Sequence, residues 1–202
     1  MAVLSEGAPR IAAVVLAAGR STRMGPSNKM LADIAGQPMV RRVAEAALAS
    51  KATAVLVVTG HMAPEVSSAL AGLDVTLVAN PDFATGLASS LKAGIRALPP
   101  PCDGALILLG DMPQIAPEHL DTLMGAFGAD AIVVPVHKGR QGNPVLWPAR
   151  FFPELLRLDG DTGAKRLIAT HAASVRDVDL GTDAIFADID TPDALTTLRG
   201  GR

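Results

Sequence analysis

Residues 11–29 read IAAVVLAAGRSTRMGPSNK, an apolar run that passes directly into a loop of glycine, serine and basic residues. Continuous apolarity from Ile11 to Ala17 is typical of a parallel strand that is covered on both faces. The small residues that follow let backbone N–H groups approach an anion closely. Because ligands of open α/β sheets bind beyond the carboxyl ends of the strands, this stretch predicts both a fold class and the edge that carries the site.

Short apolar runs and amphipathic helical segments alternate through the first half of the chain, which is the pattern of βαβ units. After His137 the alternation loosens into a glycine- and proline-rich stretch, Gly139–Pro148. Further strands are predicted at Ala54–Thr59, Val75–Ala79, Ala105–Leu109, Ala131–Val136 and Ile185–Ile189. Helices are predicted at Pro38–Ala49, Pro64–Ala71, Gly86–Leu98, Pro117–Ala126, Ala149–Leu158 and Gly163–His171, with a last one opened by Pro192. We expect an α/β fold in three layers, with a doubly wound, mostly parallel sheet, in a single domain of residues 1–202.

Composition narrows the class of protein. Of 202 residues 49% are hydrophobic and 19% charged, which suits a globular chain with a large buried sheet. The formal net charge is −2 with acids and bases interspersed, so neither a nucleic-acid surface nor a polybasic membrane anchor is expected. Cys102 is the only cysteine, which excludes an intrachain disulfide, and the first apolar run falls short of the roughly 18 residues of a membrane span. We expect a soluble, cytoplasmic protein.

The glycine-rich loop after the first strand predicts a phosphate cradle. We expect the backbone at Leu16, Ala17, Ala18 and Gly19 to approach a triphosphate in a concave anion nest, which the cations Arg23 and Lys29 would neutralise. The loop has neither the Gly-Lys-Ser/Thr of a Walker loop nor the Gly-x-Gly-x-x-Gly of a dinucleotide site. The alternative is a solvated loop with two ordinary surface cations.

Acidic residues follow two of the predicted strands. Asp111 comes directly after an apolar run, where a carboxylate near a triphosphate suits a hard cation such as Mg²⁺. Asp190 precedes Thr191-Pro192 and by itself reads as a helix cap. For Asp111, the favoured catalytic residue, the alternative is a cap of the following helix or turn. Metal binding and capping are compatible at Asp190.

Polar and small residues stand at the remaining strand ends. Thr59, Gly60 and Asn80 follow predicted strands, and Gly86 and Ser90 open a predicted helix. Such groups read a base edge or hold phosphate, but they also serve as ordinary turns and caps, so both interpretations stay open.

The run LAAGRSTRMGPSNK resembles the signature loop of the MobA-like NTP transferases, a family of sugar-nucleotide, isoprenoid and molybdenum-cofactor nucleotidyltransferases. The resemblance covers nearly the whole chain, through the motifs at residues 110–113, 139–147, 160–165 and 188–192. It implies a Rossmann-like nucleotidyltransferase fold in which Arg23 and Lys29 contact the NTP phosphates and Gly86 and Ser90 contact the nucleotide. It also implies that Asp111 and Asp190 hold Mg²⁺ (or Mn²⁺).

Within the family, the sequence resembles the molybdenum-cofactor cytidylyltransferases and the accessory proteins of molybdenum hydroxylases. Ala17-Ala18-Gly19 is similar to the cytidylyl form, whereas guanylyltransferases tend to carry a second glycine in place of Ala18. The resemblance implies that CTP and a molybdopterin-type phosphorylated acceptor react with release of pyrophosphate, and that a molybdenum hydroxylase is a client. The acceptor would bind near Pro113, Gly142, Asn143 and Asp161.

Two departures from the family pattern concern this acceptor region: Asn143 stands where many relatives carry histidine, and Lys165 where many carry arginine. One alternative is therefore the same chemistry on another acceptor, a sugar phosphate or methylerythritol phosphate. Another is a non-catalytic accessory or chaperone protein of a molybdenum hydroxylase. Retention of Lys29, Asp111 and Asp190 together favours catalysis.

Overall fold

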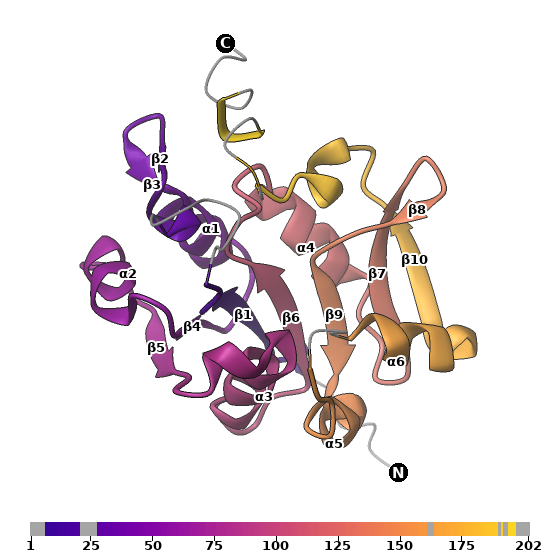
Figure 1. Cartoon of the computed structure of the whole chain (residues 1–202). Helices are drawn as coiled ribbons and strands as arrows, with labels where there is room; N and C mark the ends of the chain where they lie inside the picture. The colour runs from indigo at the N-terminus through magenta and orange to yellow at the C-terminus, as the bar shows by residue number, and fades with distance from the viewer. Residues whose placement is uncertain (1–6, 21–27, 161–163, 190, 192–193, 197–202) are drawn as a thin grey trace.

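A single mixed sheet forms the centre of the molecule. The computed structural model describes residues 7–20, 28–160, 164–189, 191 and 194–196. From one edge to the other the strand order is β10-β7-β9-β6-β1-β4-β5, with a short β8 paired to β7 (Figure 1). These strands are Val175–Asp179 (β10), Ile132–His137 (β7), Val145–Pro148 (β9), Gly104–Leu109 (β6), Ile11–Ala17 (β1), Ala54–Thr59 (β4), Thr76–Ala79 (β5) and Arg140–Gln141 (β8).

The half of the sheet around β1 follows the sequence-based expectation. β1 and β4 have the predicted bounds, and β6, β1, β4 and β5 run parallel to one another. Every residue of β1 is buried, which is the reason its apolarity is continuous. β5 differs from the prediction of a strand covered on both faces. It is the sheet edge and largely exposed, and Leu77 is 45% exposed.

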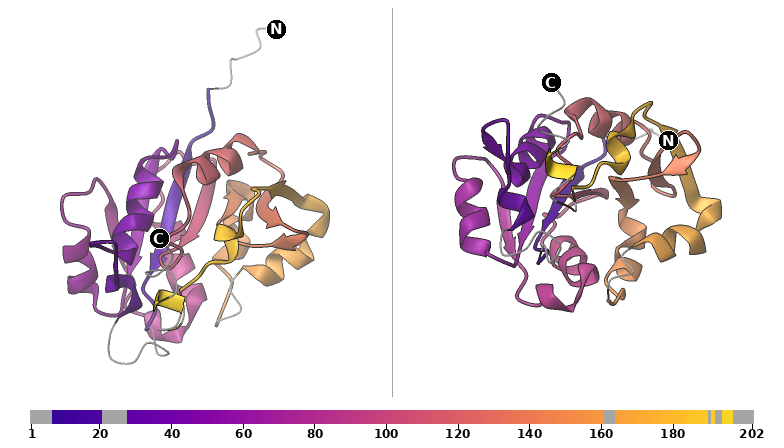
Figure 2. Two further views of the ribbon diagram at one scale, coloured as in Figure 1. Left: turned by 90° about the horizontal axis from the view of Figure 1, so that it is seen from above. Right: turned by 45° about the horizontal axis from the view of Figure 1, so that its top comes forward.

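Two helical layers cover the sheet (Figure 2). Ile11, Ala13 and Val15 share one hydrophobic cluster with the first helical layer, and Val14 and Leu16 share another with the second, as the side-chain alternation of a strand requires. The first layer consists of α1 (Met39–Leu48), α2 (Ala63–Ala69) and α4 (Pro117–Gly125), and the second of α3 (Leu87–Arg96), α5 (Phe152–Leu155) and α6 (Lys165–Thr170). The fold is therefore a three-layer, Rossmann-like α/β fold with a mostly parallel sheet, as predicted.

The half of the sheet beyond β6 departs from the prediction. β9 runs antiparallel between β6 and β7, and β10 forms the far edge, parallel to β7. The predicted last strand at Ile185–Ile189 is wrong. Residues Asp183–Phe186 form a 3-10 helix, η6, which the Thr182 side chain caps, and the chain then continues without strand structure. Ala184 and Ile185 are buried by this turn, which explains an apolar run without a strand.

Smaller elements complete the structure and connect the layers. They are η2 (Lys29–Leu31), β2 (Asp33–Ile34), β3 (Gln37–Pro38), η3 (Phe83–Thr85), η4 (Ala149–Phe151) and η5 (Ala172–Ser174). The predicted helix at Ala149–Leu158 is thus η4 followed by α5. Residues 194–196 are helical, whereas Pro192 and Gly163 lie outside the described residues. Over the described parts of the chain, none of the helices has the length and apolarity that a bilayer crossing requires.

Candidate functional site

The site is built on the carboxyl ends of β1, β4 and β6. The strand register places Ala17 beside Thr59 and Leu16 beside Leu109, and the Gly110 N–H continues the ladder to the Leu16 carbonyl at 3.0 Å. Three chain segments therefore leave the sheet at one level, as parallel strands require.

Lys29 and Asp111 meet at this edge although they lie far apart in sequence. Lys29 Nζ donates to Asp111 Oδ2 at 2.5 Å, and the two side chains are only 12% and 11% exposed. Burial of a charge is costly unless an opposite charge compensates it, so each ion stabilises the other in its ionised form. The sheet edge thus presents a cation and a carboxylate together.

The late acidic segment lies against the same point. The Ile189 N–H donates to the Asp111 carbonyl at 3.0 Å, and Ile189 is buried with Ile34, Met39 and Leu195. Figure 1 shows this C-terminal segment in yellow, beside the loop that joins β6 to α4. Asp188 is exposed and borders the large cavity described below, and Asp190 lies outside the described residues.

The polar residues at the ends of β4 and β5 are engaged with each other. The Asn80 N–H donates to the Thr59 carbonyl at 2.8 Å, and Asn80 Nδ2 donates to the hydroxyls of Ser89 and Ser90 at 2.9 and 3.0 Å. Gly86 is the N-cap of α3, with a positive φ of 116°. Thr59, Asn80 and Ser90 are each at most 5% exposed, so in this state they fix the start of α3 to the sheet.

Gly60 is required by close packing. A Cβ atom there would lie 2.6 Å from Phe83 Cβ and 2.8 Å from Ala18 Cβ. The glycine therefore lets η3 and the beginning of the glycine-rich loop after β1 approach β4, whereas Gly19 has open space around its Cβ position and is exposed.

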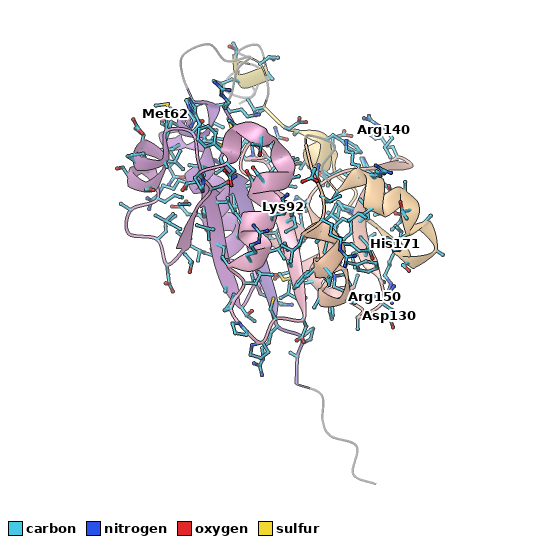
Figure 3. All side chains as sticks on the ribbon, turned by 60° about the horizontal axis from the view of Figure 1, so that its bottom comes forward. Met62, Lys92, Asp130, Arg140, Arg150 and His171 are labelled. Carbon is cyan, nitrogen blue, oxygen red and sulfur yellow. The ribbon has the colours of Figure 1, made fainter. Side chains whose placement is uncertain are left out.

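A cavity of about 860 Å³ opens beside this edge, between α3, α6 and the β7–β9–β10 part of the sheet. The size is that of a small-molecule site. Most of its lining is apolar, and the charged side chains at it are Arg140, Lys165, Asp177 and Asp188. Arg140 stacks over the Phe186 ring, with its guanidinium carbon 4.5 Å from the ring centre. Figure 3 shows Arg140 on the β7–β8 side and Lys92 on α3.

The predicted acceptor residues divide between two places. Gly142 and Asn143 line the cavity, and their N–H groups donate to the carbonyls of Pro135 and Ile185 at 2.9 and 3.0 Å. A Cβ at Gly142 would lie 2.9 Å from Ile185 Cβ, so only glycine allows η6 to pack here. Pro113 lies apart from this cavity and borders a shallower hollow with Ile34 and Arg42.

Three predicted site residues, Arg23, Asp161 and Asp190, lie outside the described residues. Residues 159 and 160, which precede Asp161, are held to α3. Lys92 Nζ pairs with Asp159 at 2.9 Å, and the Ala88 N–H donates to the Gly160 carbonyl at 3.1 Å.

Trp147 is 1% exposed and packs edge-on against Phe151, as a core residue does.

Cys102 lies just before the amino end of β6, opposite the strand ends that carry the candidate site, and burial raises the pKa of its thiol. A protonated thiol there is a poor nucleophile.

In the described ranges, His, Cys, Asp and Glu form no cluster of three or more that could hold a metal ion. One or two carboxylates are nevertheless sufficient for a magnesium ion whose other ligands are phosphate oxygens and water.

Asn28 and Arg140 are polar residues of the site that sequence reasoning missed. Asn28 is 3% exposed and caps η2 directly before Lys29, and an N-cap pattern in the sequence could have revealed it. Arg140 belongs to the motif at residues 139–147, but the motif did not indicate its place at the cavity, which depends on the packing of β8 and η6.

A sheet edge with a buried lysine–aspartate pair, a glycine-bearing loop and a neighbouring apolar cavity is an arrangement that suits the binding of a polyphosphate beside a second small molecule. Comparison with known proteins is more specific. The chain belongs to the MobA-like NTP transferase domain family, whose profile matches residues 13–175. It is therefore a nucleotidyltransferase.

Two relatives are similar over nearly their whole length. Purine catabolism protein PucB of Bacillus subtilis is 32% identical over 200 residues, which cover 95% of this chain and 97% of PucB. The molybdenum cofactor cytidylyltransferase of Escherichia coli is 27% identical, over 92% of this chain and 94% of that enzyme. By contrast, the chain spans about a quarter (26%) of the bifunctional protein GlmU of Sorangium cellulosum, at 38% identity over 123 residues.

Solved structures share the fold. Rv0371c of Mycobacterium tuberculosis superimposes with a TM-score of 0.86 at 29% identity, over 96% of this chain and 99% of Rv0371c. A second structure of Rv0371c, in complex with manganese, gives a TM-score of 0.83 at 27% identity, over 96% and 100% of the two chains.

Proposed function

We propose that this nucleotidyltransferase transfers CMP from CTP to the phosphate of a molybdopterin-type acceptor and releases pyrophosphate. The observation that carries the proposal is the Lys29–Asp111 pair beside the large apolar cavity. The pair supplies the charges that a triphosphate and its cation need, and the cavity supplies space for a flat heterocyclic acceptor. The similarity to the molybdenum cofactor cytidylyltransferase of Escherichia coli supports this choice of acceptor.

Nucleotidyl transfer requires positioning and charge neutralisation more than a protein nucleophile. An acceptor phosphate oxygen attacks the α-phosphorus, a new P–O bond forms, and the bond to the β-phosphate oxygen breaks as pyrophosphate leaves. The acceptor phosphate is already largely ionised at neutral pH, so no base is needed. Lys29, with Arg23, is proposed to neutralise the phosphates, and the backbone from Leu16 to Gly19 to hold them.

A divalent cation, Mg²⁺ or Mn²⁺, would fit a donor set of Asp111 and Asp190. Carboxylate oxygens are the ligands such hard cations prefer. The hydrogen bond from Ile189 to Asp111 is consistent with the pair, because Asp190 is the next residue in the chain. Once bound, the ion would neutralise charge on the phosphates. The manganese complex of the similar Rv0371c supports divalent metal binding.

Acceptor binding is proposed for the cavity, which Gly142 and Asn143 line. Asp161 is also proposed to contact the acceptor, and it lies outside the described residues. Pro113 borders a different hollow, and nothing in its surroundings supports an acceptor role. Thr59, Gly60, Asn80, Gly86 and Ser90 are proposed to form the nucleotide side of the site, where the mostly buried polar groups hold α3 in place. A molybdenum hydroxylase is the proposed client of the product.

The experiment that tests the proposal is an incubation of the protein with Mg²⁺, each of the four NTPs and either molybdopterin, a sugar phosphate or methylerythritol phosphate. Pyrophosphate is quantified, and the product is identified by mass. We expect pyrophosphate only with CTP and molybdopterin, since Ala17-Ala18-Gly19 resembles the cytidylyl form. Equal or faster turnover with GTP would contradict the choice of base, and turnover with another acceptor would contradict the choice of pterin.

A further inference from the structure

Asn28 is a buried polar residue at the end of the phosphate loop, directly before Lys29. Its side chain is almost inaccessible, with the whole residue 3% exposed. A buried amide has to make its hydrogen bonds within the protein, since each unmade bond costs stability. The partners of Asn28 therefore show what this residue holds together.

The two ends of the Asn28 amide bind different segments. Oδ1 accepts from the Met30 N–H at 3.0 Å and so caps η2, while Nδ2 donates to the His61 carbonyl at 3.0 Å, just beyond β4. The first bond is local and fixes the turn that carries Lys29. The second bond links this turn to a segment 33 residues away in the chain.

His61 also binds the other end of the loop. Its N–H donates to the Ala18 carbonyl at 3.2 Å. One residue, His61, thus accepts from Asn28 after the loop and donates to Ala18 before it. The backbone of His61 thereby joins the entry and the exit of the loop, and Asn28 is the side chain that completes the connection.

The position of Lys29 depends on this connection. Met30, the next residue, is 3% exposed, and its Sδ atom lies so close to Gly110 that a Cβ there would be 2.9 Å away. With Asn28 and Met30 both fixed, the backbone of Lys29 is held on two sides, and its side chain extends to Asp111. A lysine has four rotatable side-chain bonds, and ordering them costs conformational entropy. When the backbone of Lys29 is already fixed, less entropy is lost as Nζ is held at Asp111.

We propose that Asn28 is a positioning residue for nucleotide transfer: it closes the base of the phosphate loop through His61 and holds Lys29 in place at Asp111. The proposal rests on the function proposed above for Lys29. It goes beyond that function, because Asn28 affects the transfer by positioning the Lys29 side chain.

The test uses Asn28→Ser. Serine is an effective N-cap, so the bond to Met30 N–H is retained, but its shorter side chain cannot reach the His61 carbonyl. With CTP varied at saturating Mg²⁺ and acceptor, we expect kcat/KM to fall about tenfold, since small misplacements of a participating group cost up to about 10²-fold. The Kd of CTP from calorimetry in Mg²⁺ should rise in parallel. If Asn28→Ser does not fold, the isosteric Asn28→Asp is measured instead, since it keeps the cap oxygen and, when ionised, loses the donor.

A double-variant cycle distinguishes positioning from mere structural support. If Asn28 acts through Lys29, the Asn28→Ser/Lys29→Ala protein should match Lys29→Ala to within about twofold, because effects exerted through one group do not add. Additive losses would overturn the proposal. A normal kcat/KM in Asn28→Ser together with an impaired Lys29→Ala would also overturn it. That result would leave the proposed function of the protein intact. An unimpaired Lys29→Ala would instead refute the phosphate role of Lys29.

Thr53→Val is the matched control. Thr53 Oγ1 donates to the Ile11 carbonyl at 3.1 Å, at the opposite end of β1. This variant also removes one bond from a side chain to the backbone beside the same strand. It should lower Tm slightly and leave kcat/KM unchanged, whereas an equal loss of kcat/KM in Thr53→Val and Asn28→Ser would reduce the Asn28 effect to general destabilisation and overturn the proposal.

Discussion

The two halves of the sheet differ in regularity and in what they offer a ligand. The half formed by β6, β1, β4 and β5 is parallel throughout, and its core strand β1 is wholly buried. The half formed by β9, β7, β8 and β10 contains both parallel and antiparallel pairs, and its edge strand β10 carries charged side chains. These strands make up most of the sheet strands that line the cavity. We infer that the first half provides the phosphate chemistry and the second half selects the acceptor.

The strongest test of this division is Asp111→Asn, at the end of the regular half. The change removes the negative charge that faces Lys29 while keeping the side-chain shape. We expect kcat to fall by about 10²-fold or more, the scale of other lost electrostatic stabilisers. Steady-state kinetics with saturating CTP and acceptor measure the effect below the Tm of the variant. Circular dichroism melts determine that Tm, which should fall because Lys29 loses the charge that compensates it. A fully active variant would mean that Asp111 only caps a turn.

Lys29→Ala tests the same half from the cationic side. Loss of Nζ removes a point charge from the triphosphate, and kcat/KM for CTP should fall by roughly 10- to 100-fold. If Lys29 contacts a phosphate whose charge grows during transfer, kcat falls as well as the apparent affinity; if it only holds bound NTP, KM alone rises. Varied CTP at saturating Mg²⁺ decides between the two, and unchanged values of both constants would remove Lys29 from the site.

Ala169→Trp tests the second half alone. Ala169 is an exposed residue of α6 that lines the cavity, so a large side chain there should obstruct the acceptor without disturbing the core. We expect KM for the acceptor to rise about tenfold or more, while KM for CTP stays unchanged. Thr170→Trp, at the next exposed position of the same helix, is the control and should retain normal kinetics. Equal effects on both substrates would argue against separate subsites.

The smallest expected effect concerns the stability of the folded protein in acid, to which Asp179 and Asp183 contribute. The hydrogen bond from Lys138 lowers the pKa of the Asp183 carboxyl from its ordinary 3.8, and the Gly181 N–H lowers the pKa of Asp179 in the same direction. Because the folded pKa lies below the unfolded one, the ionised carboxylates stabilise the folded state above pH 3.8, and this stabilisation is lost as pH falls through the folded pKa.

Thermal melts between pH 7 and pH 3 check this expectation. The wild type should lose Tm below about pH 4 more steeply than Asp183→Asn, by at most a few degrees because both carboxylates are solvent-exposed. Salt at about 1 M should reduce the difference, since exposed ion pairs are screened. Identical curves for the two proteins would show that the Lys138–Asp183 pair does not stabilise the fold.

The regular half could be read from the sequence because each of its signals is local. An apolar run that must be buried on both faces has only one arrangement in an α/β sheet, so β1 and β4 were predicted with their bounds. β9 was missed because its residues follow a glycine- and proline-rich stretch. β10 was missed because its exposed Arg176 and Asp177 hide the apolar pattern of an edge strand.

The sequence by itself determined the fold class, the bounds of β1 and β4, and the sheet edge at which Lys29 and Asp111 occur. It did so because hydrophobic periodicity and strand ends are properties of neighbouring residues. Only the tertiary structure decided that Lys29 pairs with Asp111, that Ile189 packs beside them and that Asn28 binds His61. Those contacts join segments far apart in the chain, and their partners are selected by burial and hydrogen bonding in the folded state.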